Sequence, residues 1–286
     1  MSTLQGAGVH GAASWRITRI LSLRWIVWGA AAIFFLNLLG VIAVVIANSF
    51  ATHWFGSWLP AGWTLKYYAQ SWQNYQLSGI LVVTLQVAFA AVIVSLLIGT
   101  PAAYALARRN FPGKRLMMLA FLLPIMVPPI TYGIPLATLL YKLHLGGTLT
   151  GVVIANLVPP VPFVILVMTP FIEQIDPRIE AAARMCGAKT WQVFLRVLAP
   201  LLVPGLLAAA LLVLIQTVAL FELTFLVSGP GSQTLVVALY YAVFASGIRP
   251  AQAISAMAVI YMLTTLVVLV VTLRYVRPTQ MVGTVR

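Results

Sequence analysis

Carboxylates are the scarcest chemical groups in this sequence. Of 286 residues only four are acidic, and Glu173, Asp176 and Glu180 lie close together. Such a cluster could bind a cation, accept a proton or pair with basic groups of a partner. The fourth, Glu222, lies in an apolar stretch, where an unpaired carboxylate in lipid would cost at least about 3 kcal/mol, so it should face protein or a water-filled cavity.

The sequence has no motif for an enzyme. It contains no H-E-x-x-H, no G-x-S-x-G, no Walker A loop and no acid and histidine paired at membrane depth. His10, His53 and His144 are far apart, which gives a metal site little support, and the single cysteine, Cys186, excludes an intrachain disulfide. We therefore expect no catalytic residue, no bound metal and no cofactor held by this chain.

The elements that position these groups follow from the composition. The chain is 62% hydrophobic and 7% charged with a mean hydropathy of +1.03, so lipid must be its main solvent. Several apolar runs reach the roughly 20 residues that cross a bilayer. We predict an all-α polytopic bundle of about six transmembrane helices, over residues 25–47, 79–106, 116–141, 149–172, 201–227 and 251–275. The prolines in the third span predict a kink.

Lysine and arginine orient these spans. Fourteen of the 17 basic residues fall before the first span or after the second, fourth and sixth, and only Lys66, Lys142 and Arg249 fall on the other side. The positive-inside rule therefore places both termini in the cytoplasm, and explains the net charge of +13 without nucleic acid.

This layout divides the chain into tails and one membrane domain. We expect cytoplasmic tails at 1–24 and 276–286 and a transmembrane domain over 25–275. Within that domain, 48–78 is expected to be a periplasmic interfacial loop with an aromatic belt, and 173–200 a long cytoplasmic loop.

The long cytoplasmic loop begins with the signals of a short helix. Asp176 is a plausible N-cap, Pro177 suits the first helical position, and Glu180 favours the positive end of the helix dipole. Ala181–Ala183 would permit close approach by a partner, and Gly187 can end the helix in a left-handed cap.

A second helical stretch starts at Thr190. Trp191, Phe194 and Val197 recur at spacings of three, which lays one face along protein or the membrane interface. From spacing alone, the whole loop could also be an ordinary amphipathic surface segment between two spans.

The loop resembles a known motif. Gly187, nine further residues and Val197-Leu198-Ala199-Pro200 are similar to the second half of the EAA loop of type I ATP-binding cassette importer permeases. At the front, Ala181 stands where that family has glutamate, while Glu180 matches an extra glutamate of polyamine-type members. The stretches ARRNFPGKR, LLPIMVPP and VSGPGSQTL also look like these permeases.

The resemblance implies an inner-membrane permease of a bacterial importer. The EAA helix, called the coupling helix, would dock into a cleft of a cytoplasmic ATPase dimer, and Glu180 or Arg184 could pair with charges on its rim. ATP and Mg would bind in that partner. The resemblance also implies a second permease chain and a periplasmic solute-binding protein as partners. The second permease is expected to be a different chain, because many relatives are heterodimers. The residues assigned to coupling are Glu180, Ala181, Ala182, Ala183, Arg184, Gly187 and Ala188.

Polar residues at membrane depth are candidates for the translocation path. These are Glu222, Gln216, Asn156 and Tyr132, although each could instead bond a neighbouring helix. Resemblance of YYAQSW and VSGPGSQTL to spermidine/putrescine and opine permeases favours a polyamine-like or opine-like solute, with sugar as the alternative.

A rival of another class is an ion-coupled secondary transporter. Such a protein normally needs coupling carboxylates near the midplane, often in repeated halves. A single acid near a helix end and the lack of an internal repeat argue against it.

Overall fold

The computed structural model describes residues 9–54, 56–244 and 250–275, with side chains from residue 25 to residue 274. Residues 1–8 and 276–286 of the predicted tails lie outside the described residues. The rest of the first predicted tail is helical from Val9, since α1 continues through it into the first span. The helices are α1 (Val9–Phe50), α2 (Lys66–Asn74), α3 (Leu77–Arg108), α4 (Lys114–Met126), α5 (Pro129–Lys142), α6 (Leu149–Ala155), α7 (Pro160–Glu173), α8 (Pro177–Met185), α9 (Thr190–Gln192), the π-helix η1 (Val193–Leu198), α10 (Ala199–Ala219), α11 (Glu222–Val227), α12 (Leu235–Phe244) and α13 (Ala251–Tyr275).

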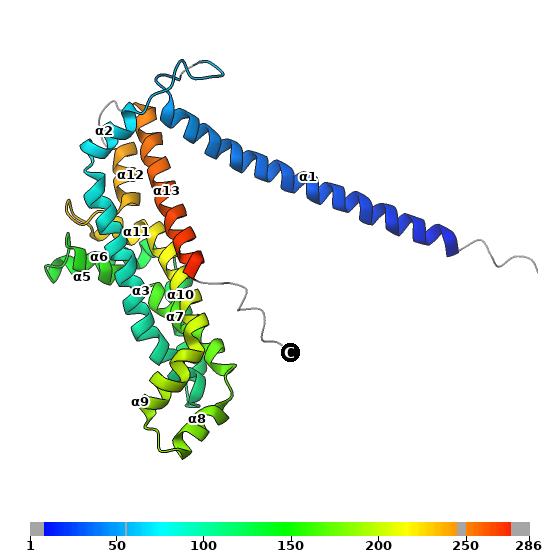
Figure 1. The fold of residues 1–286 in the computed structure, drawn as a ribbon, viewed down its shortest axis with the longest axis vertical. Helices are drawn as coiled ribbons and strands as arrows, with labels where there is room; N and C mark the ends of the chain where they lie inside the picture. Colours follow the sequence, from blue (N-terminus) through cyan, green and yellow to red (C-terminus); the bar gives the residue numbers. More distant parts are fainter. Residues whose placement is uncertain (1–8, 55, 245–249, 276–286) are drawn as a thin grey trace, which may run out of the picture.

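The all-α membrane architecture is confirmed. Four helices of the described chain are long and apolar enough to cross a bilayer, and two bent pairs bring the number to six if each pair is one span. Apart from one isolated bridge between Ala51 and Trp63, the described residues form helices and their connections. In Figure 1, α3, α7, α10 and α13 form a bundle, while α1 points away from it and meets it near its C-terminal end.

Prolines break the third and fourth predicted spans. α4 and α5 are bent by 93° at a break where Val127 and Pro128 are extended. Each of these residues precedes a proline, which disfavours helical backbone. The expected kink is therefore a break into two helices. α6 and α7 are bent by 43° across residues 156–159, but here Pro159, which precedes Pro160, keeps helical backbone.

Three further boundaries correct the predicted layout. The fifth span does not run to residue 227, because α10 ends at Ala219 and α11 begins at Glu222. The expected loop at 48–78 contains the helix α2, which is amphipathic and lies at one end of the bundle (Figure 1). The apolar helix α12 was not predicted, and its 10 residues are too few to cross a bilayer.

Close packing of α3 against α7 and α10 forms the main core. The core includes Ala88, Val164, Met168, Leu202 and Val213. Gly99 of α3 allows this approach, because a Cβ there would lie 2.6 Å from Val164 Cγ1. Small residues at helix contacts are the usual basis of packing between membrane helices.

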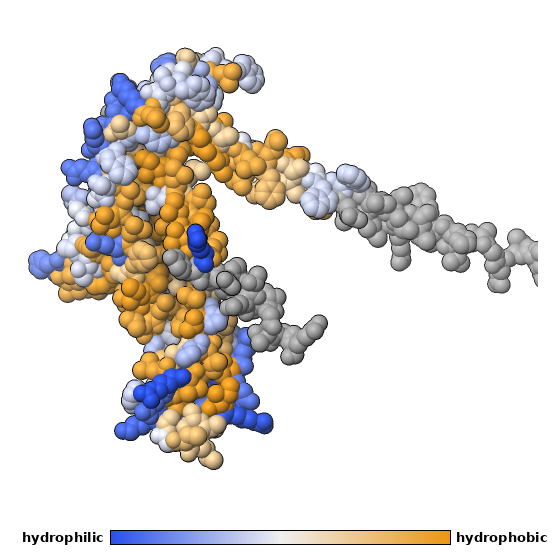
Figure 2. Space-filling model, in the orientation of Figure 1, coloured by the Kyte–Doolittle hydropathy of each residue, from blue (hydrophilic) through white to orange (hydrophobic). Residues whose placement is uncertain are grey.

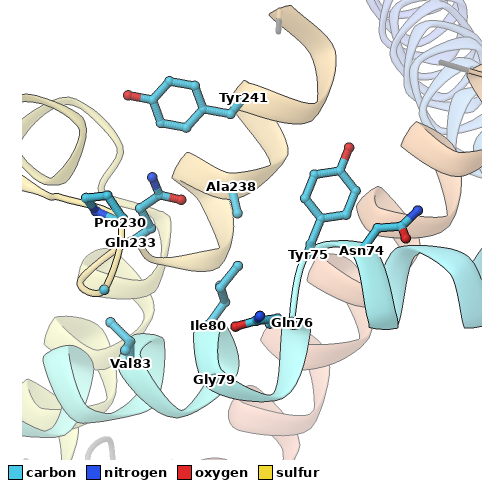
Figure 3. Close-up of a pocket in the computed structure, with 11 residues that line it drawn as sticks. Asn74, Tyr75, Gln76, Gly79, Ile80, Val83, Pro230, Gln233, Ala238 and Tyr241 are labelled. Carbon is cyan, nitrogen blue, oxygen red and sulfur yellow. The ribbon is translucent and has the colours of Figure 1, made fainter. Parts of the chain in front are cut away.

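The two ends of the bundle differ in chemistry. Figure 2 shows an apolar middle, with hydrophilic residues at both ends of the bundle, including the end that carries α8 and α9. That end holds the basic residues Arg108, Arg109, Lys114, Arg115, Arg178, Arg184, Lys189 and Arg196. The positive-inside rule makes it the cytoplasmic end. The far end has a pocket between α2, α3 and α12 (Figure 3).

Candidate functional site

The helix α8 forms as its sequence predicts. Asp176 is its N-cap, and its Oδ1 accepts a hydrogen bond from the Arg178 backbone N–H at 2.9 Å. Pro177 occupies the first helical position, where a missing N–H costs nothing. The predicted short helix is confirmed and ends at Met185.

The end of α8 is a Schellman turn. Gly187 N–H donates to Arg184 O at 2.9 Å and Ala188 N–H donates to Ala183 O at 3.1 Å. Gly187 has φ of +84°, and no atom lies within 4 Å of a Cβ built on it. Glycine is therefore favoured here by the backbone conformation and not by lack of space.

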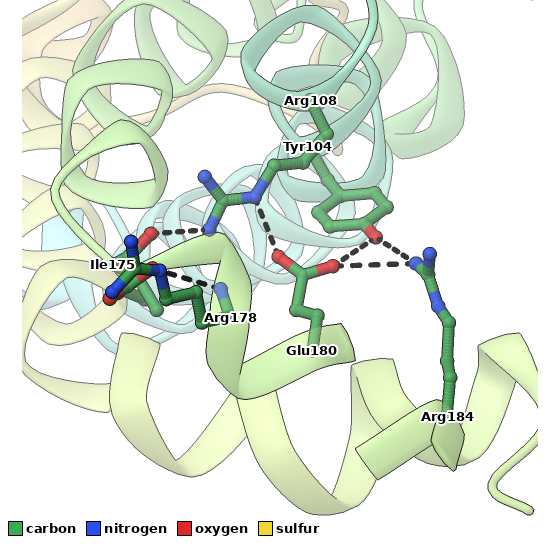
Figure 4. A network of polar contacts seen from close by, with 7 residues as sticks. Tyr104, Arg108, Ile175, Arg178, Glu180 and Arg184 are labelled. Carbon is green, nitrogen blue, oxygen red and sulfur yellow. Dashed lines mark hydrogen bonds and ion pairs between the residues drawn. The ribbon is translucent and has the colours of Figure 1, made fainter. Parts of the chain in front are cut away.

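Glu180 is the centre of a polar network that joins α8 to α3 (Figure 4). Its Oε1 accepts from Arg108 Nε at 2.6 Å and its Oε2 accepts from the Tyr104 hydroxyl at 2.7 Å. Arg108 also donates to Ile175 O at 2.7 Å, just before α8. Since one buried carboxylate is paired and doubly hydrogen-bonded, α8 is held firmly against the end of α3.

This geometry corrects the role expected for Glu180. Its residue is 4% exposed, so its carboxylate faces the bundle and cannot reach the rim of a partner. Arg184 is different, because its side chain is 53% exposed. Its Nη2 lies 3.5 Å from Glu180 Oε2 at the edge of the network. Pairing of Arg184 with a partner remains a prediction.

The opposite face of α8 is open. Ala181, Ala182 and Cys186 are exposed, and Ala183 and Ala188 are partly exposed. Met185 is 90% exposed, which is unusual for a large apolar side chain at the polar end of a membrane protein. Met185 was not among the residues predicted for coupling, although its place one turn after Ala181 and Ala182 puts it on the same face.

The stretch after α8 also departs from its predicted face. The helix from Thr190 is present, but Val193 and Leu198 are its buried residues, while Trp191 is exposed. Phe194 packs edge-on against Tyr104 with ring centroids 5.6 Å apart. Residues Val193–Leu198 form a π-helix, whose wider turn shifts the face expected from regular spacing.

The predicted path residues do not share one environment. Asn156 is fully buried and its amide donates to Thr224 Oγ1 at 2.9 Å, which joins the end of α6 to α11. Tyr132 and Glu222 are partly buried and lie within electrostatic range of each other. Gln216 is partly buried on α10. Asn156 is thus placed as a packing residue, and a path role for the other three stays a prediction.

Among the described residues, no three His, Cys, Asp or Glu side chains gather in a way that could hold a metal ion. At the cytoplasmic end, α8 is a firmly held helix whose exposed face carries small and apolar side chains.

Comparison with known proteins settles the family. Residues 95–280 match the family described as binding-protein-dependent transport system inner membrane component. The chain belongs to this family. It is therefore a multi-pass protein of the inner membrane. The match contains every helix from α4 to α13 together with the C-terminal part of α3, residues 95–108.

Relatives of this inner membrane component differ in their named solutes. It is 33% identical over 160 residues to the trehalose transport system permease protein of Mycobacterium tuberculosis, covering 56% of this chain and 58% of the relative. It is 32% identical over 177 residues to the sulfate transport system permease protein of Escherichia coli, covering 57% of this chain and 64% of the relative. The chain thus spans less than two thirds of the length of each.

A solved structure has the same fold. A bacterial ABC transporter involved in the import of the acidic polysaccharide alginate contains a chain that superposes with a TM-score of 0.70. The sequences are 20% identical, and the match covers 96% of this inner membrane component and 99% of that chain. This similarity supports the fold over the matched 96% of the chain.

Proposed function

We propose that this chain is a permease subunit of an ATP-binding cassette importer, and that α8 is the element that docks on the ATPase. The observation that carries the proposal is the contrast between the two faces of α8. Glu180 fixes one face to α3, while Ala181, Ala182 and Met185 leave the other face exposed at the cytoplasmic end.

The contacts of α8 suggest how movement would reach the membrane. A push on α8 is carried to α3 by the Glu180–Arg108 ion pair, and from α3 to η1 by the Tyr104–Phe194 contact. α3 in turn packs on α7 and α10 through the main core. Coupling through packed, rigid elements of this kind needs no flexible relay.

The other components of the importer are expected in separate chains. ATP and Mg would bind to the cytoplasmic ATPase dimer, because this sequence has no phosphate-binding loop. We propose a second, different permease chain to complete the pathway and a periplasmic binding protein to deliver the solute. This chain itself would have no enzymatic activity.

A substitution at Met185 tests the docking proposal. Met185→Glu places a charge in the contact, so the ATPase should no longer co-purify and ATP hydrolysis should lose its stimulation by the binding protein. Met185→Leu keeps an apolar side chain of similar volume and should behave as wild type. Normal co-purification and stimulation of Met185→Glu would rule out this face as the docking surface.

We propose a sugar as the transported solute. The permease named for trehalose and the structural relative that imports alginate support a saccharide, whereas the relatives above give no support to the polyamine-like or opine-like expectation. The sulfate permease keeps an oxyanion as the second candidate. Uptake of radiolabelled trehalose, sulfate and spermidine in cells with and without the chain separates the three.

A further inference from the structure

A polar pocket opens at the end of the bundle opposite α8. It has a volume of about 360 Å³, within the range of small-molecule sites, and it lies between the end of α2, the start of α3, the loop after α11, and α12. Neither the coupling site nor any predicted path residue contributes to it.

Uncharged groups line this pocket. Figure 3 shows the rings of Tyr75 and Tyr241 and the amides of Gln76 and Gln233 around one gap, with the Asn74 amide turned away. None of the lining residues is Asp, Glu, Lys, Arg or His. The two glutamine side chains make no hydrogen bond to other described residues, so their donors and acceptors are available to a ligand.

Three hydrogen bonds hold the loop and α12 sides of the pocket in place. Gln76, on the side formed by the start of α3, has φ of +49°, a left-handed conformation that costs a residue with a side chain about 1–2 kcal/mol. The opposite loop is fixed by Ser232, whose Oγ accepts from Gly229 N–H at 2.8 Å and donates to Gly147 O at 2.9 Å. Leu235 N–H donates to Thr84 Oγ1 of α3 at 2.9 Å, which ties the start of α12 to the same helix as Gln76. The pocket is therefore preformed.

One wall continues into an aromatic cluster. Tyr241 lies 5.8 Å from Phe225 and 6.0 Å from Tyr240, measured between ring centroids. The Tyr241 ring is thus held by its neighbours and remains 41% exposed. Aromatic rings offer a flat apolar surface, while amides both donate and accept hydrogen bonds.

We propose that this pocket is a contact site for a neutral polyhydroxylated solute, such as one sugar unit, at the outer mouth of the permease. A sugar has apolar C–H faces for Tyr75 and Tyr241 and hydroxyl groups for Gln76 and Gln233. Cationic side chains would favour sulfate and carboxylates would favour a polyamine, and the lining has neither. This inference rests on the proposed function, because it concerns the solute of the same permease.

Saturation-transfer NMR on the purified transporter complex in nanodiscs tests the site, with trehalose as the probe. Gly79→Leu fills the pocket, since nothing lies within 4 Å of a Cβ at Gly79. The matched control is Ser78→Leu, an exposed neighbour on the same helix that does not line the pocket. We expect trehalose signals with wild type and Ser78→Leu, and their loss with Gly79→Leu.

Removal of single amides sharpens the test. Gln76→Gly deletes an amide and also relieves the left-handed backbone, so any loss of binding is not a loss of folding. Gln76→Gly and Gln233→Leu should each weaken trehalose binding by about tenfold. Displacement of trehalose by sulfate or spermidine, equal signals in the two leucine variants, or no signal with wild type would each overturn the sugar site.

Co-purification of the ATPase tests the permease assignment separately from the pocket. Co-purification of the ATPase with all four variants is expected, because the pocket lies at the other end of the bundle. If trehalose fails to bind while the ATPase still co-purifies, the pocket proposal falls and the proposed function stands. If the ATPase never co-purifies, the proposed function itself fails.

Discussion

Glu180 is the residue whose surroundings differ most from what its position in the sequence suggests. Its partner Arg184 is one helical turn away and could be expected from the sequence, but Arg108 and Tyr104 are 72 and 76 residues away. A single sequence carries no signal for such long-range pairing. The carboxylate was therefore assigned to a partner protein when it in fact orients α8 within this chain.

Neutralising Glu180 should weaken both the fold and the coupling. Glu180→Gln leaves the largely buried Arg108 without its counter-charge, which should cost about 3–5 kcal/mol of stability. We expect a lower thermal unfolding temperature in detergent and loss of ATP hydrolysis stimulated by the binding protein.

The paired substitution of both residues provides the control. Arg108→Met combined with Glu180→Met removes both charges and should regain stability relative to either single variant, as a double-mutant cycle would measure. Wild-type stability and coupling in Glu180→Gln would show that the network does not position α8.

At the scale of elements, the sequence predicted correctly those features that depend only on neighbouring residues, such as the two ends of α8. The cap at Asp176, the proline at the start of α8 and the left-handed turn at Gly187 were all readable and are all confirmed. The break near Pro128 was expected as a kink, but its 93° bend depends on how α4 and α5 pack, and the break before Pro160 was not predicted. The π-helix was missed, because its sequence has no marked breaker or cap. α12 was missed although Gly229-Pro230-Gly231 precede it, because its 10 apolar residues are too few for a transmembrane span.

Substitutions at Gly187 should separate backbone strain from steric effects. Since a Cβ there has no neighbour within 4 Å, Gly187→Ala should cost about 1 kcal/mol through the left-handed backbone alone. Gly187→Asn should cost less, because asparagine tolerates that conformation. Thermal unfolding and ATPase co-purification should rank glycine above asparagine and asparagine above alanine, and equal behaviour of all three would contradict the capping role.

At the scale of the whole molecule, most of the architecture could be predicted from composition and charge. The count of about six spans and the segregation of basic residues at the α8 end were both predictable, because hydropathy and the positive-inside rule act over whole segments. The direction in which α1 leaves the bundle could not be predicted from the sequence. Its apolar residues, including Trp25, Trp28 and Phe34, are exposed, so its place depends on lipid or on another chain.

Cys186 reports the orientation of the whole molecule. It is exposed beside α8 and is the single cysteine of the chain, so no competing thiol needs to be removed. A membrane-impermeant maleimide should label it in inside-out vesicles and not in intact spheroplasts. Labelling from the periplasmic side would reverse the topology and exclude docking of α8 on a cytoplasmic partner.

The π-helix η1 has a mechanical consequence for the junction between the cytoplasmic end and α10. A π turn holds one residue more than an α turn, and each residue of an α-helix advances the chain by about 100° around the axis. If the extra residue passes toward Lys189, Trp191 and Phe194 rotate about the helix axis while the backbone remains hydrogen-bonded. Such a rotation would slide Phe194 across Tyr104, the aromatic contact that joins η1 to α3.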